Sequence, residues 1–113
     1  MGENKDYMTH PEELGSIHIS EDVLASLAAG AAAEVEGISG LMNVAAKKSG
    51  TRGVRLAVDE DGAVVDLYVM IRYGYAIPEV AGKLQGGVSG AIESMTGFAV
   101  KAVNVHVGGV SFQ

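Results

Sequence analysis

Two stretches of the sequence carry apolar residues at the three- and four-residue spacing of an amphipathic helix. The first spans residues 20–35, where Ser20 is a favourable N-cap and two acidic residues follow it. The second runs from Pro78, a residue suited to a first helical turn, to Met95, and Thr96-Gly97 ends it. The two apolar stripes comprise Val23, Leu24, Leu27, Ala28, Ala31, Val35 and Ile38, and then Ile77, Val80, Ala81, Leu84, Val88, Ala91, Ile92 and Met95.

Four other segments alternate apolar and polar residues with the two-residue period of a half-buried strand. They are residues 16–19, 54–58, 65–73 and 98–107. The turn at residues 59–62, which ends in a glycine, predicts a hairpin between the second and third strands. We expect one core-facing row on the third strand, namely Val65, Leu67, Val69, Ile71 and Tyr73. Residues 39–53 are harder to interpret: residues 41–45 are compatible with a helical turn, and residues 47–53 with an exposed loop.

The resulting order, β-α-β-β-α-β, is that of the split βαβ or ferredoxin-like motif. It predicts an α+β two-layer sandwich with two helices packed on one face of a mixed four-stranded sheet. Residues 1–14 show no periodicity and are expected to form a flexible N-terminal tail, followed by a single domain over residues 15–113. The uncovered sheet face would carry His18, Arg55, Asp66, Tyr68, Met70, Arg72, Asn104 and His106.

Composition narrows the functional classes. The chain of 113 residues has no cysteine, so it has neither disulfides nor thiolate chemistry. A net charge of −6 and the absence of tryptophan disfavour nucleic acids as partners, because phosphates are repelled and base-stacking platforms are scarce. We see no signal peptide and no apolar run approaching the roughly 20 residues of a membrane span. The expected location is therefore cytoplasmic, without direct membrane insertion.

Sequence motifs for catalysis are also missing. The chain has no dinucleotide-binding or phosphate-binding glycine motif, no zinc-protease motif and no nucleophile elbow, so we expect neither an enzyme nor a cofactor. An RNA-binding adaptor is an alternative, because residues 37–40 and 87–90 have the GxxG spacing of a K-homology loop. Neither segment carries the basic residues that such a loop uses.

A small metal-binding protein is a second alternative. His18 and His106 would share the uncovered sheet face, and Asp66 could supply a third ligand. Two solvent-facing histidines on strands explain the pattern more simply, so the expectation is that no metal is bound.

The second helix contains the most unusual pattern. Gly82, Gly86 and Gly90 recur every four residues and span only about 80° of the helix circumference, nearly opposite the apolar stripe. Each helical glycine costs about 1 kcal/mol relative to alanine, yet a strip without side chains lets another backbone approach closely. We predict that this glycine strip, flanked by Glu79, Lys83 and Glu93, is an interface for self-association or for a partner. Packing against the chain's own loop, or simple drift to small residues, is the alternative.

Six segments in order then resemble a known family. They are residues 15–20 (GSIHIS), 32–40 (AAEVEGISG), 65–74 (VDLYVMIRYG), 77–81 (IPEVA), 95–97 (MTG) and 103–112 (VNVHVGGVSF). Together they are similar to the alkaline shock protein, or general stress protein 24, family of bacterial envelope stress proteins.

The resemblance implies a non-enzymatic domain in the cell-envelope stress response. It implies a protein partner, either a second copy in a homo-oligomer or a membrane-anchored protein that holds the chain at the inner face of the membrane. Recurrent family positions, such as Gly74, Pro78 and Gly97, have structural interpretations at turns and helix ends. The glycines of the second helix depart from the charged residues usual there.

Overall fold

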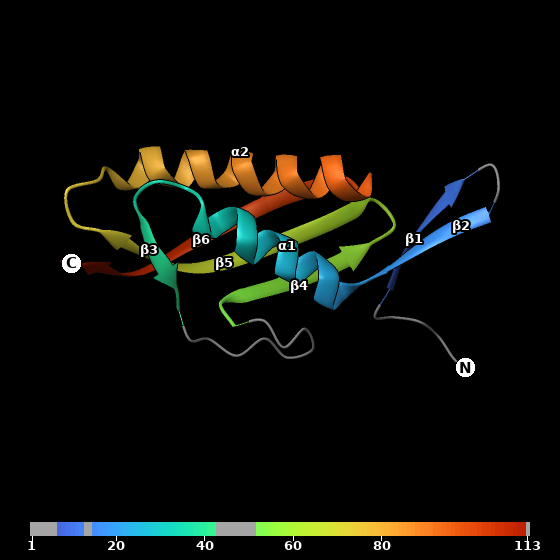
Figure 1. Cartoon of the computed structure of the whole chain (residues 1–113), viewed down its shortest axis with the longest axis horizontal. Coiled ribbons are helices and arrows are strands. Elements are labelled where there is room, and N and C mark those ends of the chain that lie inside the picture. Colours follow the sequence, from blue (N-terminus) through green and yellow to red (C-terminus); the bar gives the residue numbers. More distant parts are fainter. Residues whose placement is uncertain (1–6, 13–14, 43–51, 113) are drawn as a thin grey trace.

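The computed structural model describes residues 7–12, 15–42 and 52–112 (Figure 1). Two helices lie side by side on one face of a sheet, and a separate hairpin lies at one end of the molecule. The elements in chain order are β1 (Tyr7–Glu12), β2 (Gly15–Ser20), α1 (Glu21–Ala33), β3 (Ile38–Leu41), β4 (Val54–Asp59), β5 (Gly62–Arg72), α2 (Ile77–Thr96) and β6 (Val100–Ser111).

Strand β5 is the centre of the sheet. One of its edges pairs in parallel with β6, and the other pairs antiparallel with β4 along its first half and with β3 near its end. The sheet is therefore mixed and four-stranded, and both helices cover the same face of it. This confirms the predicted two-layer α+β sandwich.

The identity of one strand was predicted wrongly. Residues 15–20 do not enter the four-stranded sheet but pair with Tyr7–Glu12, a segment expected to belong to the tail. Their place in the sheet is taken by β3, which lies partly in the segment that gave no clear pattern. This strand has only four residues, and Ser39 and Gly40 interrupt its apolar alternation, so its period is too short to recognise. The expected loop at residues 47–53 lies mostly outside the described residues.

The core lies between the helices and the sheet and is entirely apolar among the described residues. The predicted inward row of β5 is confirmed from Val65 to Ile71, each at most 1% exposed. Tyr73 was wrongly assigned to that row, because β5 ends at Arg72 and the tyrosine is 70% exposed. The helices contribute Leu24, Ala25, Ala28 and Ala32 from α1, and Val80, Leu84, Val88 and Ile92 from α2.

The helix ends follow the predicted capping residues. The Ser20 hydroxyl accepts a hydrogen bond from the Val23 amide, and Gly97 ends α2 in the left-handed conformation with φ of 80°. Helix α1 ends at Ala33, two residues before the predicted end. A short link follows in which Gly37 has φ of 101°, and a Cβ there would lie 2.8 Å from Val80 Cγ2. This glycine therefore lets the chain pass closely beside α2 on its way into β3.

Candidate interaction surfaces

The glycine strip of α2, defined as Gly82, Gly86 and Gly90, faces outward. All three residues are exposed, and a Cβ built on any of them would have no atom of the described chain within 4 Å. By contrast, a Cβ built on Gly87 of the same helix would lie 3.8 Å from Val35 Cγ2. Packing against the chain's own loop is therefore not the reason for these glycines within the described residues.

A groove runs beside the strip, between α2 and β6. It has a volume of about 490 Å³, and its floor is the first half of β6, from Val100 to Asn104. Gln85, Gly86 and Ser89 form its helix side, so one glycine of the strip belongs to both surfaces. Gln85 crosses the groove, and its Nε2 donates to the Val103 carbonyl at 3.0 Å.

The charged residues predicted to flank the strip are all exposed. Glu79 lies in the first turn of α2, where a negative charge suits the positive helix end. Glu93 has a role within the chain, because its Oε2 accepts a hydrogen bond from the Val100 amide at 3.0 Å and joins α2 to the beginning of β6. Lys83 lies on the same exposed surface.

The sheet face opposite the helices carries a ladder of stacked side chains. The Tyr68 ring stacks on the His106 ring, with centroids 4.4 Å apart and planes 10° apart. The Arg55 guanidinium lies over the Tyr68 ring, 5.5 Å from its centroid. Asp66 Oδ1 lies 3.1 Å from His106 Nε2 and accepts from Asn104 Nδ2 at the same distance. The ladder thus joins β4, β5 and β6 across the uncovered face.

The ladder brings together five of the polar residues predicted for this face, and His18 and Arg72 are not part of it. His18 belongs to β2 and lines a pocket with Val23, Leu27 and Met95. The prediction that His18 and His106 share a sheet face is therefore wrong, and the proposed metal-ligand set loses one of its members. No group of three His, Asp or Glu residues within the described ranges is arranged to hold a metal ion.

Neither GxxG segment forms a loop between two helices. Residue 37 immediately precedes β3 and residues 38–40 belong to it, while residues 87–90 lie inside α2. The spacing that suggested a K-homology loop therefore arises from a strand entry and a helix interior.

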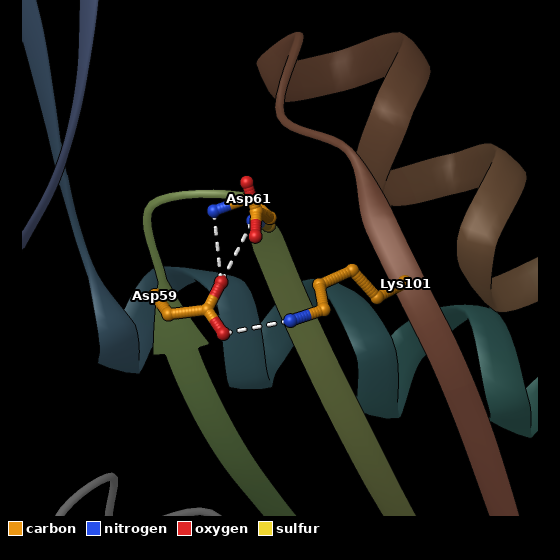
Figure 2. A network of polar contacts seen from close by, with 4 residues as sticks. Asp59, Asp61 and Lys101 are labelled. Carbon is orange, nitrogen blue, oxygen red and sulfur yellow. Dashed lines mark hydrogen bonds and ion pairs between the residues drawn. The ribbon is translucent and has the colours of Figure 1, made fainter.

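A polar network fixes the start of β6 to the β4–β5 turn (Figure 2). Asp59 Oδ1 accepts from the amides of Asp61 and Gly62, and its Oδ2 accepts from Lys101 Nζ at 2.7 Å. The hydrogen bond from Lys101 is the main cause that lowers the pKa of the Asp59 carboxyl, and the bond from the Asp61 amide is the second. The Asp59–Lys101 hydrogen bond also raises the pKa of Lys101. The Lys101 and Asp59 side chains are 38% and 55% exposed, and their contact ties the start of β6 to the turn.

Sequence reasoning missed an aromatic pair near the C-terminus. The rings of Tyr73 and Phe112 lie 5.0 Å apart and are 70% and 78% exposed. Nearby, Tyr75 Oη donates to Glu36 Oε2, which raises the pKa of the tyrosine. The available signal was the end of the alternation after residue 72, which leaves Tyr73 beyond the strand.

These features define a small α+β domain whose exposed surface carries the glycine strip, the groove beside it and the ladder. The described helices include none whose length and apolar content would allow it to cross a membrane. Neither the family whose model matches this chain nor the similar proteins indicate an enzyme.

Residues 9–112 match the alkaline shock protein 23 family, which is described as having a cell envelope-related function. The chain belongs to this family, and the resemblance seen in the sequence is confirmed. The uncharacterized proteins YloU of Bacillus subtilis and Spy1535 of Streptococcus pyogenes are 34% and 37% identical to it. The first alignment covers 85% of this chain and 88% of YloU, and the second covers 88% of this chain and 81% of Spy1535.

Solved structures of the MamM CTD share the fold. One variant superposes with a TM-score of 0.58 over 81% of this chain and 94% of that chain, at 14% sequence identity. A second variant gives a TM-score of 0.53 over 79% of this chain and 96% of that chain, at 13% identity. At these identities the similarity concerns the α+β architecture alone.

Proposed function

We propose that this domain is a non-catalytic protein-interaction module of the cell-envelope stress response. It acts in the cytoplasm, at the inner face of the membrane, by self-association or by docking to a membrane-anchored partner. The contact surface is the glycine strip of α2, with Glu79, Lys83 and Glu93 at its margin. Family membership supports the envelope role, since the family function is described as cell envelope-related.

One observation carries the proposal: three helical glycines face solvent with no neighbouring atom of the described chain. Their cost in helix stability is about 1 kcal/mol each relative to alanine, and nothing in the described fold offsets it. Outward glycines at four-residue spacing are favourable when another backbone approaches the helix, because no Cβ keeps the two chains apart. The groove beside Gly86 extends this smooth surface down to the sheet.

The test is to place a large side chain on the strip without disturbing the fold. Gly86→Leu adds a good helix former that points into open space, so the monomer should remain folded. We expect at least a tenfold weaker recovery of crosslinked assemblies from the membrane fraction of the native cell, with an unchanged or higher melting temperature.

Gly30→Leu in α1 is the matched control. Gly30 is also an exposed helical glycine with nothing within 4 Å of its would-be Cβ, but it lies on the other helix. Assemblies should survive in this variant. If Gly86→Leu assembles as well as the parent protein, the glycine strip is not the contact surface.

A further inference from the structure

Strand β6 has an edge that no other strand of the described chain pairs with. It spans twelve residues, Val100–Ser111, and among the described residues it pairs along one side only, with β5. The register with β5 shifts near each end, and between these irregularities residues 102–107 form a regular strand. An exposed regular edge of this length is a template for pairing with another strand, unless charge, proline or a cover blocks it.

The backbone groups on this outer edge can be assigned from one contact. The Val103 carbonyl accepts from the Gln85 side chain, so it points away from β5. Because successive residues of a strand point their backbone groups to opposite edges, Val105 and Val107 face the same way as Val103. Within the described chain, Gln85 and Glu93 provide side-chain hydrogen bonds to this edge, at Val103 and Val100. The stretch from Asn104 to Val107 lies beyond both, and a strand that pairs at Val103 must share that carbonyl with the Gln85 side chain or displace it.

The residues of this stretch are compatible with self-pairing. Between Ala102 and Val110 no side chain is charged at neutral pH with histidine neutral, and the charge of Lys101 is paired with Asp59. An antiparallel two-fold pair centred on Val105 places Val103 opposite Val107 of the second copy. It also places Asn104 opposite His106, and Lys101 opposite Gly109. No like charges face one another, which is the condition that an isologous interface must meet.

The opposite edge of the sheet is less suitable. Strand β4 has only six residues, and exposed Arg55 lies along it; short length and charge are two ways in which natural edges are protected from pairing. Beside β6, by contrast, the helix side of the groove consists of Gly86 and Ser89, which have small side chains or none, and of Gln85, whose side chain crosses the groove to Val103.

We infer that a second copy of this chain pairs with the outer edge of β6, antiparallel to it, about a two-fold axis near Val105. The two four-stranded sheets would then form one continuous sheet, with the α2 helices adjacent on the same side. This inference rests on the proposed function, because it identifies the protein partner as a second copy. Strand addition would take place beside the glycine strip, since Gly86 also lines the groove next to β6.

The absence of native cysteine allows a sharp test, since only introduced thiols can form a bridge. Asn104→Cys and His106→Cys are prepared separately with tags of different size, mixed, and oxidised under mild conditions. Directly opposed residues of an antiparallel pair have Cβ atoms about 4.5–5.5 Å apart, whereas diagonal residues lie about 7–8 Å apart. We therefore expect the mixed disulfide dimer to exceed both homodimers several-fold beyond the statistical ratio. Ala57→Cys, exposed on β4, is the control and should remain monomeric.

Each outcome decides the inference. An excess of the 104–106 dimer, with Ala57→Cys unreacted, supports pairing through β6. Equal crosslinking of all three variants indicates random collision and overturns it. The parent protein is also sedimented at about 100 µM, a concentration comparable to the dissociation constants of weak protein complexes. If it is a monomer there, a second copy is not the partner. The proposed function would then still be judged separately, by the Gly86→Leu variant in the native cell.

Discussion

The two helices differ in the size of the residues that they bury. In α1 the buried face is rich in alanine, since Ala25, Ala28 and Ala32 are fully buried, and the exposed face carries one glycine, Gly30. In α2 the inward positions are large, including Leu84 and Ile92, and the glycines point outward. Small residues on an inner face let a helix approach its neighbours closely. On the outer face of α2 the described chain has no atom within 4 Å of a Cβ built on these glycines, and the proposed function places a second molecule there.

The largest expected effect concerns the inner face of α2. Leu84 is fully buried, and Leu84→Ala removes its packing and leaves a cavity between helix and sheet. We expect a loss of about 2–5 kcal/mol in the free energy of unfolding, measured by urea denaturation. Ser94→Ala, on the exposed side of the same helix, should stay within about 0.5 kcal/mol of the parent protein. A loss below about 1 kcal/mol for Leu84→Ala would show that α2 is loosely packed and that its two faces do not differ.

The outer face should respond in the opposite direction. Replacing Gly82, Gly86 and Gly90 together by alanine adds three methyl groups that meet open space. We expect the monomer to gain about 2–3 kcal/mol in unfolding free energy, because each substitution restores the helix propensity that glycine lacks. The measurement is urea unfolding at a protein concentration low enough to keep the chain monomeric.

A substitution at the same control position, Gly30→Ala, is the control for that experiment. It should gain about 1 kcal/mol, since its helical position and open surroundings match those of the strip. If the triple variant gains nothing while Gly30→Ala does, the strip is already covered in the parent protein. Stability would then increase with protein concentration, as mass action requires of an assembled state.

Much of the fold could be predicted because its signals are local. Ser20 and Gly97 mark helix ends by their own chemistry, and the buried row from Val65 to Ile71 follows from the two-residue period. Strand β3 could not be found in this way, since four residues contain only two periods of alternation. The partner of residues 15–20 was also out of reach, because pairing is a non-local choice that the alternation of one strand does not specify.

The candidate surfaces also differ in whether local sequence or the pairing of distant segments determines them. The outward direction of the glycine strip follows from 3.6 residues per turn, and the structure agrees with it. The stacking of Tyr68 on His106 requires the parallel register of β5 and β6, which places these residues opposite each other. The groove beside α2 likewise depends on packing between elements distant in sequence. Periodicity therefore identified the face of a helix, and only the assembled sheet identified its neighbours.

The smallest expected effect is the loss of the exposed ion pair between Asp59 and Lys101 at the sheet. Asp59→Asn keeps the side-chain oxygen that accepts from the turn amides but removes the charge that holds Lys101. The folded state lowers the pKa of Asp59 below its usual value of 3.8, so the stabilisation is present above that pH. It is lost as pH falls through the lowered pKa. The parent protein should thus be slightly more stable than Asp59→Asn at pH 7, and the difference should vanish in strong acid.

Lys101→Met removes the same ion pair from the other side and should reproduce this loss at pH 7. The pKa of Lys101 is raised above 10.5, so its share of the stabilisation is complete below that pH and disappears only as pH rises through the raised value. The double variant should therefore be no less stable than either single variant, because one interaction can be removed only once. If the stability losses of the two single variants add up in the double variant, Asp59 and Lys101 act through separate contacts. The exposed groups would then contribute more to the stability of the sheet than the contrast between the buried and exposed faces of α2 suggests.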